Sequence, residues 1–342
     1  MKKTGLIFVA ILLSFLIIGC GQDASSTVDK EIVIKLSHVS SPGSARDLGA
    51  HKVKEIVEAE TEGRVKVDVY PSSQLGGQRD QVEGVQSGNI EMVVVPTAYL
   101  GGTQPLITLL DTPFFLPPDL DDLKELYSSD AIRALLDTTE EVGIKTLSIW
   151  HTGYMQYSAN RPILKPDDLK GLKVRVMASP ILFEQAKTFG ADGITMDFSE
   201  TYSALQSRAI DGQENPIDTI FDMKFHEVQS DISLTTHGTL DQLFLVNQKW
   251  FESLDADIQA AIIKGVEEGQ KVTVDSTYEA IERAKGIILS EGVNIHEVTP
   301  EQRTVFEEDA KPIIEFARNH FGEQGKKLFN DIEAEIKRIT GK

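Results

Sequence analysis

The sequence predicts an α/β protein built from two lobes, because a strand–helix rhythm occurs twice along the chain. Short segments that alternate polar and apolar residues, as strands do, are followed by segments with apolar residues at helical spacing. The first series covers residues 31–95 and the second covers residues 172–215. This order predicts largely parallel sheets with helices on both faces. From residue 247 onward the pattern is mostly helical.

The first series predicts three strands and two helices, namely strands at 31–37, 64–70 and 90–95 and helices at 44–61 and 77–87. Gly63 ends the first helix and Pro71 ends the second strand, as these residue types commonly do. The proline-rich stretch 113–118 is expected to be a rigid loop. An acidic helix over 119–140 and a strand over 145–150 are expected to follow it.

The second series predicts strands at 172–176, 194–196 and 210–215 and helices at 180–189 and 199–207. The chain is expected to cross between the lobes near Gly153. Residues 250–290 contain only three glycines as weak interruptions, so one long or kinked helix is expected to bridge the lobes. The predicted boundaries are 31–152 plus 241–280 for lobe I and 153–240 plus 281–342 for lobe II.

The N-terminus has the features of a bacterial lipoprotein signal. Lys2 and Lys3 precede an apolar run from residue 5 to 19 that stops at Cys20, and Ile17-Ile18-Gly19-Cys20 resembles a lipobox. The alternatives are a membrane anchor, for which the run is short against about 20 residues, and a buried structural cysteine. We therefore predict a signal peptide at 1–19, a diacylglycerol on Cys20, a tether over 20–30 and an exported protein held at the cell membrane.

Composition limits the class of partner. The chain has 53 acidic and 34 basic side chains and a formal charge of −19. Nucleic-acid binders need basic patches, so this class is excluded. A small anionic ligand is still allowed, because one buried arginine can set the local potential. Cys20 is the only cysteine, so disulfides are not expected to stabilise the fold.

The common catalytic signatures are absent from the sequence. It contains no GxSxG, GxxxxGK[ST], HExxH or GxGxxG motif. The seven histidines are scattered without metal-ligand spacing. The carboxylate pairs 121–122, 140–141 and 267–268 fall on predicted helix exteriors. We expect neither an enzyme nor a metal or cofactor site.

The first candidate binding segment is 168–176, DLKGLKVRV. On a strand, Lys173 and Arg175 share one face and the neighbouring apolar residues share the other. Arg175 lies near the carboxyl end of its strand, which is the edge where open α/β sheets bind ligands. Its planar guanidinium can hold a carboxylate with two hydrogen bonds. The alternatives are a structural ion pair or a surface arginine.

The second candidate segment is 211–216, DGQENP. Asp211 and Gly212 favour a turn, and Pro216 keeps Asn215 in an extended conformation. An asparagine held there presents a donor and an acceptor beyond the strand end. Asn before Pro is also common in ordinary loops.

With these segments placed, the chain resembles the DctP-type solute-binding proteins of tripartite ATP-independent periplasmic (TRAP) transporters. The resemblance runs from about Ile32 to the C-terminus. It depends on five motifs in order, which are YPSSQLG at 70–76, NRPI at 160–163, DLKGLKVRV at 168–176, YSALQ at 202–206 and DGQENP at 211–216.

The resemblance implies a two-lobed, periplasmic-binding-protein-like fold whose cleft closes on a small organic acid. It implies delivery of that acid to a membrane permease driven by an ion gradient. Arg175 falls on the family's carboxylate-binding arginine and Asn215 on an asparagine that supports the same carboxylate. Phe198 matches an aromatic residue that lies against the ligand in some members, with a core role as the alternative. Gln242 matches a cleft position.

One position departs from the family pattern. Many members have another basic residue where this sequence has Met155. A thioether offers no donors to a second carboxylate or to a heavily hydroxylated acid. This argues against a dicarboxylate and favours a monocarboxylate or an acid with an apolar or aromatic remainder. His38 is placed to contact the far end of the ligand, and the alternative is a loop histidine that faces water.

Three other classes remain open from the sequence. An ABC-type binding lipoprotein would have the same lobes with an ATP-driven partner, and neighbouring genes would discriminate the two. A ligand-sensing receptor of the same fold is also possible. An exported enzyme would turn over the bound acid, and no catalytic constellation supports it.

Overall fold

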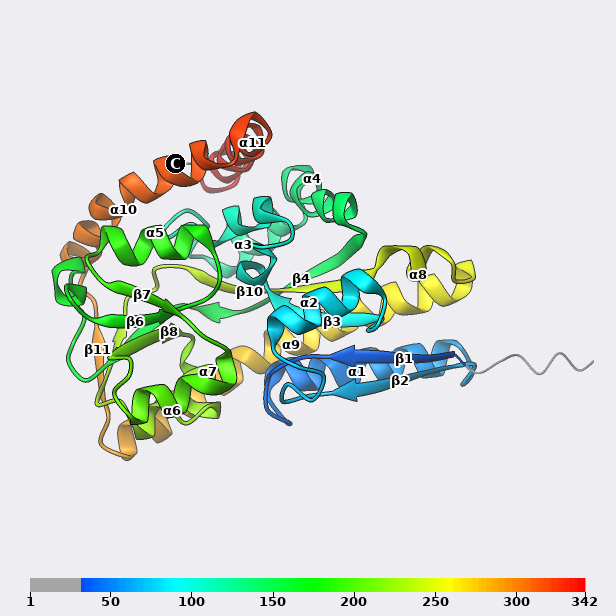
Figure 1. The fold of residues 1–342 in the computed structure, drawn as a ribbon, viewed down its shortest axis with the longest axis horizontal. Helices are drawn as coiled ribbons and strands as arrows, with labels where there is room; N and C mark the ends of the chain where they lie inside the picture. Colours follow the sequence, from blue (N-terminus) through cyan, green and yellow to red (C-terminus); the bar gives the residue numbers. More distant parts are fainter. Residues whose placement is uncertain (1–31, 342) are drawn as a thin grey trace, which may run out of the picture. The chain divides into compact units, whose positions relative to one another are not determined.

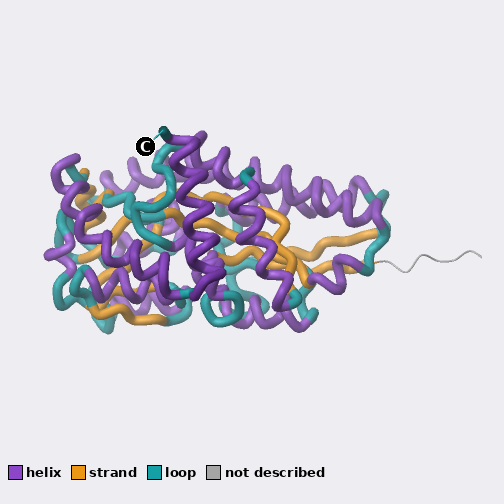
Figure 2. The backbone as a smooth tube through the Cα atoms, turned by 90° about the horizontal axis from the view of Figure 1, so that it is seen from above, coloured by secondary structure: helices purple, strands orange, loops and turns teal. Residues whose placement is uncertain are grey.

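The computed structural model describes residues 32–341. The predicted signal peptide, Cys20 and the tether at 20–30 lie outside the described residues. The described chain contains two β-sheets flanked by helices and one helix of 35 residues (Figures 1 and 2). The prediction of a two-lobed α/β fold with a long helix is confirmed. We call the part built on the first sheet lobe I and the part built on the second sheet lobe II.

Lobe I contains a five-stranded sheet with the order β2-β1-β3-β10-β4. Its strands are β1 (Ile32–Ser37), β2 (Val65–Tyr70), β3 (Met92–Pro96), β4 (Ile144–Tyr154) and β10 (Thr239–Asn247). Helices α1 (Ala45–Glu60) and α2 (Gln78–Ser87) connect the first three strands, as predicted. Ser44 caps α1 by accepting a hydrogen bond from the backbone N–H of Asp47.

Lobe II contains a six-stranded sheet with the order β11-β9-β5-β8-β6-β7. Its strands are β5 (Gln156–Ala159), β6 (Lys173–Val176), β7 (Asp192–Thr195), β8 (Gly212–Asn215), β9 (Asp231–Leu234) and β11 (Asn294–Glu297). Helices α5 (Pro180–Thr188) and α6 (Thr201–Gln206) connect β6, β7 and β8, and α7 (Ile217–Asp222) follows β8.

Both sheets are mixed, so the expectation of largely parallel sheets is wrong in part. In lobe I, β10 runs antiparallel to β3 and β4, and in lobe II, β5 runs antiparallel to β8 and β9. Each antiparallel strand arrives from the other lobe, because β4 leads into β5 and β9 leads into β10. A strand that enters at the edge where the parallel strands end has to run in the opposite direction. The two crossings meet where the N–H of Met155 donates to the carbonyl of Gly238 (2.8 Å).

The long helix α9 (Ala256–Ser290) contacts both lobes. It packs on α1 and β4 of lobe I and on α7 of lobe II, and 35 residues span about 50 Å. It begins later than predicted, because residues 248–252 form a separate short helix, α8 (Gln248–Glu252).

The predicted helix over 119–140 is divided into shorter helices. α3 (Leu120–Tyr127) ends at Ser128, and Ser129 caps a new helix, α4 (Asp130–Asp137), by accepting from the N–H of Ile132. Short 3₁₀ segments lie before and after them, at Thr97–Leu100, Pro105–Asp111 and Thr138–Val142.

Two C-terminal helices cover different elements. α10 (Pro300–His320) packs on α5, whereas α11 (Gly322–Thr340) packs on α3 and α4. Their buried residues join the same apolar core as β3, β5 and β6. Within residues 32–341, no helix has the length and apolar character needed to cross a membrane.

Candidate ligand-binding site

The candidate site lies where the parallel strands of both sheets end and the lobes contact each other. In lobe I, β1 leads into the loop before α1, and β3 leads into the 3₁₀ segment Thr97–Leu100. In lobe II, β6 ends at Val176 and β8 ends at Asn215. This edge is the expected place for a ligand in an open α/β sheet.

Arg175 lies on β6 and is only 1% exposed. Its Nη2 donates to the hydroxyl of Tyr99 (2.7 Å) and to the carbonyl of Met196 (3.5 Å). Its Nε is buried without a hydrogen-bond partner, and it forms no ion pair with any of the residues 32–341. It is therefore neither a surface arginine nor part of a structural ion pair. Tyr99 belongs to lobe I, so the hydrogen bond joins the two lobes.

Asn215 is the last residue of β8 and is also buried. Its amide donates to Oε1 of Gln213, and Gln213 lies directly opposite Arg175 in the sheet. Residues paired across strands share a face, as do residues two apart on one strand. Arg175, Gln213 and Asn215 therefore lie on one face of the lobe II sheet. Gln213 was not predicted, and its only sequence signal is its position two residues before Asn215.

Phe198 begins a short 3₁₀ turn, Phe198–Glu200. The guanidinium carbon of Arg175 lies 5.5 Å from the centre of its ring, within the range of a cation–π contact. Its ring and that of Phe225 pack edge to face in the lobe II core, with 5.9 Å between the ring centres. Phe198 thus contributes to the core and also lines the hollow between the lobes.

Gln242 and His38 are fully buried in lobe I. Gln242 donates to the hydroxyl of Thr152 (3.2 Å), and its Oε1 has no partner. Nε2 of His38 lies 3.2 Å from a carboxylate oxygen of Asp47, and its Nδ1 has no partner. Burial lowers the pKa of His38 below its usual value. The alternative that His38 faces water is therefore wrong.

Met155 lies at the crossing between β4 and β5. Its side chain is buried and belongs to the large apolar core. The next residue, Gln156, lies opposite Asn215 in the sheet. Met155 is thus adjacent in sequence to a partner of the site, but it has no polar group to offer there.

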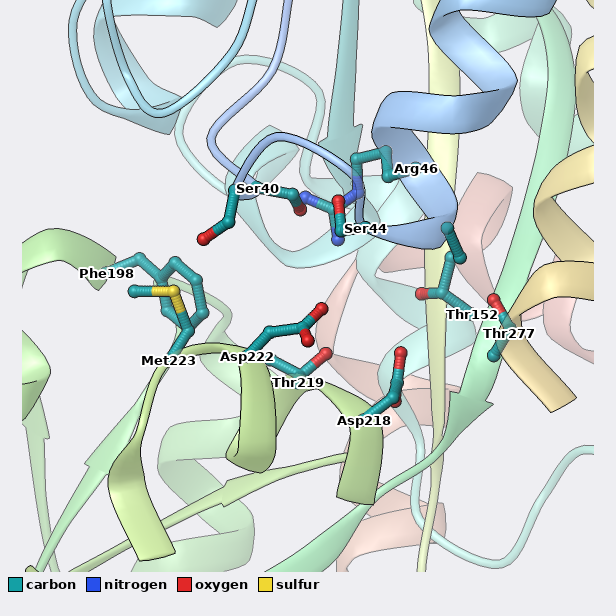
Figure 3. A pocket seen from close by; sticks show the side chains of 12 residues that line it. Ser40, Ser44, Arg46, Thr152, Phe198, Asp218, Thr219, Asp222, Met223 and Thr277 are labelled. Atoms are coloured by element: carbon teal, nitrogen blue, oxygen red, sulfur yellow. The ribbon is translucent and has the colours of Figure 1, made fainter. Parts of the chain in front are cut away.

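A narrow, partly open hollow with a cavity volume of about 20 Å³ lies between the two lobes (Figure 3). Ser40, Ser44 and Arg46 line it from lobe I, and Asp218, Thr219 and Asp222 of α7 face them from lobe II. Phe198 and Met223 close one side, and Thr152 and Thr277 close the other. Phe198 and Thr152 connect this hollow to Arg175 and Gln242 through the contacts described above.

Besides Gln213, sequence reasoning missed three residues of this region, namely Tyr99, Arg46 and Asp218. Arg46 had a usable signal, because a cation in the first turn of a helix opposes the helix dipole and needs another reason to be there. Asp218 had no such signal in the sequence, because an acidic residue is common in the first turn of a helix such as α7. Burial raises the pKa of Asp218 to about 7 and lowers the pKa of Arg46 to about 10.

The described residues contain no group of three or more His, Cys, Asp or Glu side chains able to hold a metal ion. The chain has two α/β lobes, two crossings between them and a long helix that contacts both. Together with a polar hollow lined by Arg46 and the buried Arg175 beside it, these features define a two-lobed ligand-binding protein. A sequence model of the bacterial extracellular solute-binding proteins, family 7 (DctP), matches residues 36–320. The chain therefore belongs to the DctP family of TRAP-transporter solute-binding proteins.

Known relatives cover most of the chain. The C4-dicarboxylate-binding periplasmic protein DctP of Rhodobacter capsulatus is 34% identical over 82% of this chain and 85% of its own length. A TRAP periplasmic solute-binding protein from Desulfovibrio salexigens, solved with bound orotic acid, has a TM-score of 0.87 and 36% identity, covering 90% of this chain and 99% of its own. A sugar-acid-binding protein from Advenella mimigardefordensis, solved with galactonate, has a TM-score of 0.86 and 26% identity. The match covers 91% of this chain and 99% of that protein's chain.

Proposed function

We propose that this protein captures a small organic acid by its carboxylate and delivers it to the membrane permease of a TRAP transporter. The observation that carries the proposal is Arg175, a buried guanidinium with no ion-pair partner in the described chain. A buried charge without a partner is unfavourable, so such a group is suited to an anionic ligand. Family membership and relatives that bind acids support the same function.

Each candidate residue has a role in this proposal. Arg175 holds the ligand carboxylate with two parallel hydrogen bonds, and Asn215 supports the same carboxylate. Phe198 lies against the ligand. Gln242 and His38 contact it from lobe I, and Met155 closes the site where the lobes join.

Binding requires no bond chemistry. The lobes open and close about the crossing segments, and the ligand shifts this equilibrium because the closed state binds it better. Closure excludes water, which lowers the local dielectric constant and strengthens the charge-assisted hydrogen bonds. The lobe boundaries we propose are 31–152 plus 241–280 for lobe I and 153–240 plus 281–342 for lobe II.

The N-terminus completes the proposal. Cleavage after residue 19 and a diacylglycerol on Cys20 would hold the protein at the outer face of the cell membrane, with residues 20–30 as a tether. The motif at 17–20 supports this. Mass spectrometry of the N-terminal peptide from cells would detect the lipid, and an unmodified Cys20 would contradict the proposal.

The binding step is tested by replacing Arg175 with Ala or Lys in the mature protein. Removing one partner of a buried charged pair costs about 2–5 kcal/mol, so calorimetry against a panel of organic acids should show affinity reduced about 30-fold or more in both variants. Arg208→Ala, at an exposed arginine of the same lobe, serves as the control and should bind normally. Unchanged affinity in the Arg175 variants would show that Arg175 does not bind the ligand carboxylate.

A further inference from the structure

We propose that Arg46 and Asp218 form a second recognition site at the far end of the same cleft. This site selects acids whose remainder is uncharged and rich in hydrogen-bonding groups, such as hydroxyls or amides. The inference rests on the proposed function, because the first carboxylate is assigned to Arg175. It departs from the expectation drawn from Met155, which favoured an apolar or aromatic remainder over a heavily hydroxylated one.

Arg46 is a buried cation without a hydrogen-bond or contact ion-pair partner in the described chain, although the charge of Asp218 favours its protonated form. It lies in the first turn of α1, is 7% exposed, and forms no hydrogen bond or ion pair within the described part of the chain. Its Nε is fully buried and unpartnered. Its position at the positive end of the α1 dipole adds to the electrostatic cost. A guanidinium kept in this position has five donors and needs acceptors from outside the protein.

Asp218 approaches the same hollow from lobe II. It lies in the first turn of α7 and is 6% exposed, and its Oδ1 is buried without a hydrogen-bond partner. Figure 3 shows Asp218 and Asp222 facing Ser40, Ser44 and Arg46 across the hollow. The site therefore offers unsatisfied donors from one lobe and an unsatisfied acceptor from the other.

Tyr99 connects the two ends of the cleft. Its hydroxyl accepts a hydrogen bond from Arg175 and also interacts electrostatically with Arg46. Phe198 provides a second link, because it contacts Arg175 and lines the hollow beside Asp218. A ligand held by Arg175 can therefore reach the hollow when the lobes separate to admit it.

The charges and hydroxyls of the hollow decide which remainder fits. A second carboxylate would meet Arg46 but also two acidic residues, Asp218 and Asp222, so like charges would oppose it. An apolar remainder would leave Arg46 and Asp218 unsatisfied. Hydroxyl or amide groups can accept from Arg46 and donate to Asp218, and the three serines and three threonines of the lining add further partners.

Two matched pairs of acids test this selection by calorimetry on the mature protein. D-Galactonate and hexanoate share a six-carbon chain, and orotate and benzoate share a six-membered ring, but only the first of each pair carries neutral polar groups. Succinate supplies the second carboxylate. We expect the unmodified protein to bind a polar acid at least tenfold more tightly than its apolar counterpart or succinate.

The variants Arg46→Met and Asp218→Asn should each lower the affinity for the polar acid about tenfold or more. They should change the affinity for the apolar acid less than twofold. Lys52→Met, which removes a cation paired with Glu55 on the same helix, is the control and should change neither. The melting temperature of ligand-free Arg46→Met should equal or exceed that of the unmodified protein, since an unpaired buried charge has been removed. A structural arginine would instead lower it.

The outcomes separate the two proposals. If acids bind and require Arg175, but the Arg46 and Asp218 variants affect polar and apolar acids alike, the second recognition site is wrong and the proposed function stands. Tightest binding of succinate, lost in Arg46→Met, would make Arg46 a second carboxylate anchor and overturn the selection of a neutral remainder. If no acid binds the unmodified protein, the proposed function itself fails.

Discussion

At the scale of single residues, five of the candidate cleft residues each have a buried polar atom without a hydrogen-bond partner. Native proteins leave few buried polar groups without partners. Here Nε of Arg175, Nε of Arg46, Oδ1 of Asp218, Oε1 of Gln242 and Nδ1 of His38 are all buried and unpartnered. They come from four separate elements and the loop after β1, and both lobes contribute. Their unused donors and acceptors are best explained as partners for a bound molecule.

Asp111 gives a residue-scale prediction about stability and pH. It ends the 3₁₀ segment Pro105–Asp111, and one of its oxygens accepts from Thr97 while the other has no partner. Burial raises its pKa to about 7. When the pH is below the ordinary pKa of an aspartic acid, near 3.8, the carboxyl is protonated in both the folded and the unfolded chain. Its contribution to stability is therefore full at acidic pH and is lost as the pH rises through about 7.

Asp111→Asn removes the titrating group and replaces it with an amide side chain of nearly the same shape. The melting temperature of the variant minus that of the unmodified protein should be near zero at pH 4 and clearly positive at pH 8. Scanning calorimetry at both values measures it, since each pKa unit corresponds to about 1.4 kcal/mol. Asp121→Asn, at an exposed carboxylate of α3, is the control. Its melting temperature should differ from that of the unmodified protein by the same small amount at pH 4 and at pH 8. A difference that is not larger at pH 8 would contradict the assignment.

At the scale of elements, two glycines let α1 and α9 pack closely. A Cβ on Gly269 would lie 2.8 Å from the carbonyl oxygen of Gly49 and 3.0 Å from the Trp150 ring. Gly269→Ala should therefore destabilise the protein by about 1–3 kcal/mol through overpacking. Gly286→Ala, on the same helix with nothing within 4 Å, should instead stabilise it by up to about 1 kcal/mol. Urea unfolding of both variants measures the contrast, and equal effects would exclude close packing as the cause.

Local patterns predicted the repeated strands and helices well, because each has its own periodicity and its own glycine or proline boundary. They failed where the fold depends on distant contacts. Residues 239–247 form β10 between β3 and β4 of lobe I, but nothing nearby in the sequence shows that the chain returns there from lobe II. The predicted helix over 119–140 failed for a local reason, because Ser128 and Ser129 end one helix and cap the next.

The candidate site follows the same division. Arg175 and Asn215 could be named as candidates because they lie at the ends of recognisable strands and within family motifs. Tyr99, Arg46 and Asp218 could not, because they come near these candidates only where the two lobes meet. Only the opposed helix dipole at Arg46 was visible beforehand.

At the scale of the whole molecule, the two sheets have equivalent topologies. The order β2-β1-β3 followed by the incoming strand β10 in lobe I corresponds to β7-β6-β8 followed by β5 in lobe II. The incoming strands lie next to the crossings, whereas β2 and β7 lie at the far edges of the five strands that correspond. In the proposed opening and closing of the lobes, β2 and β7 therefore move relative to each other.

Ligand-induced closure can be measured between these outer strands. Asp68 on β2 and Asp192 on β7 are exposed, and Cys20 is the only native cysteine, so a soluble form lacking residues 1–20 accepts two spin labels at Asp68→Cys and Asp192→Cys. Because the closed state binds the ligand better, a bound acid should shift the distance distribution to one shorter, narrower population in pulsed electron paramagnetic resonance. The same labelled protein with Arg175→Ala should keep its ligand-free distribution at the same acid concentration. If the distance distribution of the protein with Arg175 intact does not change when an acid is bound, capture occurs without closure. The permease would then have to recognise the ligand-bound receptor by another feature.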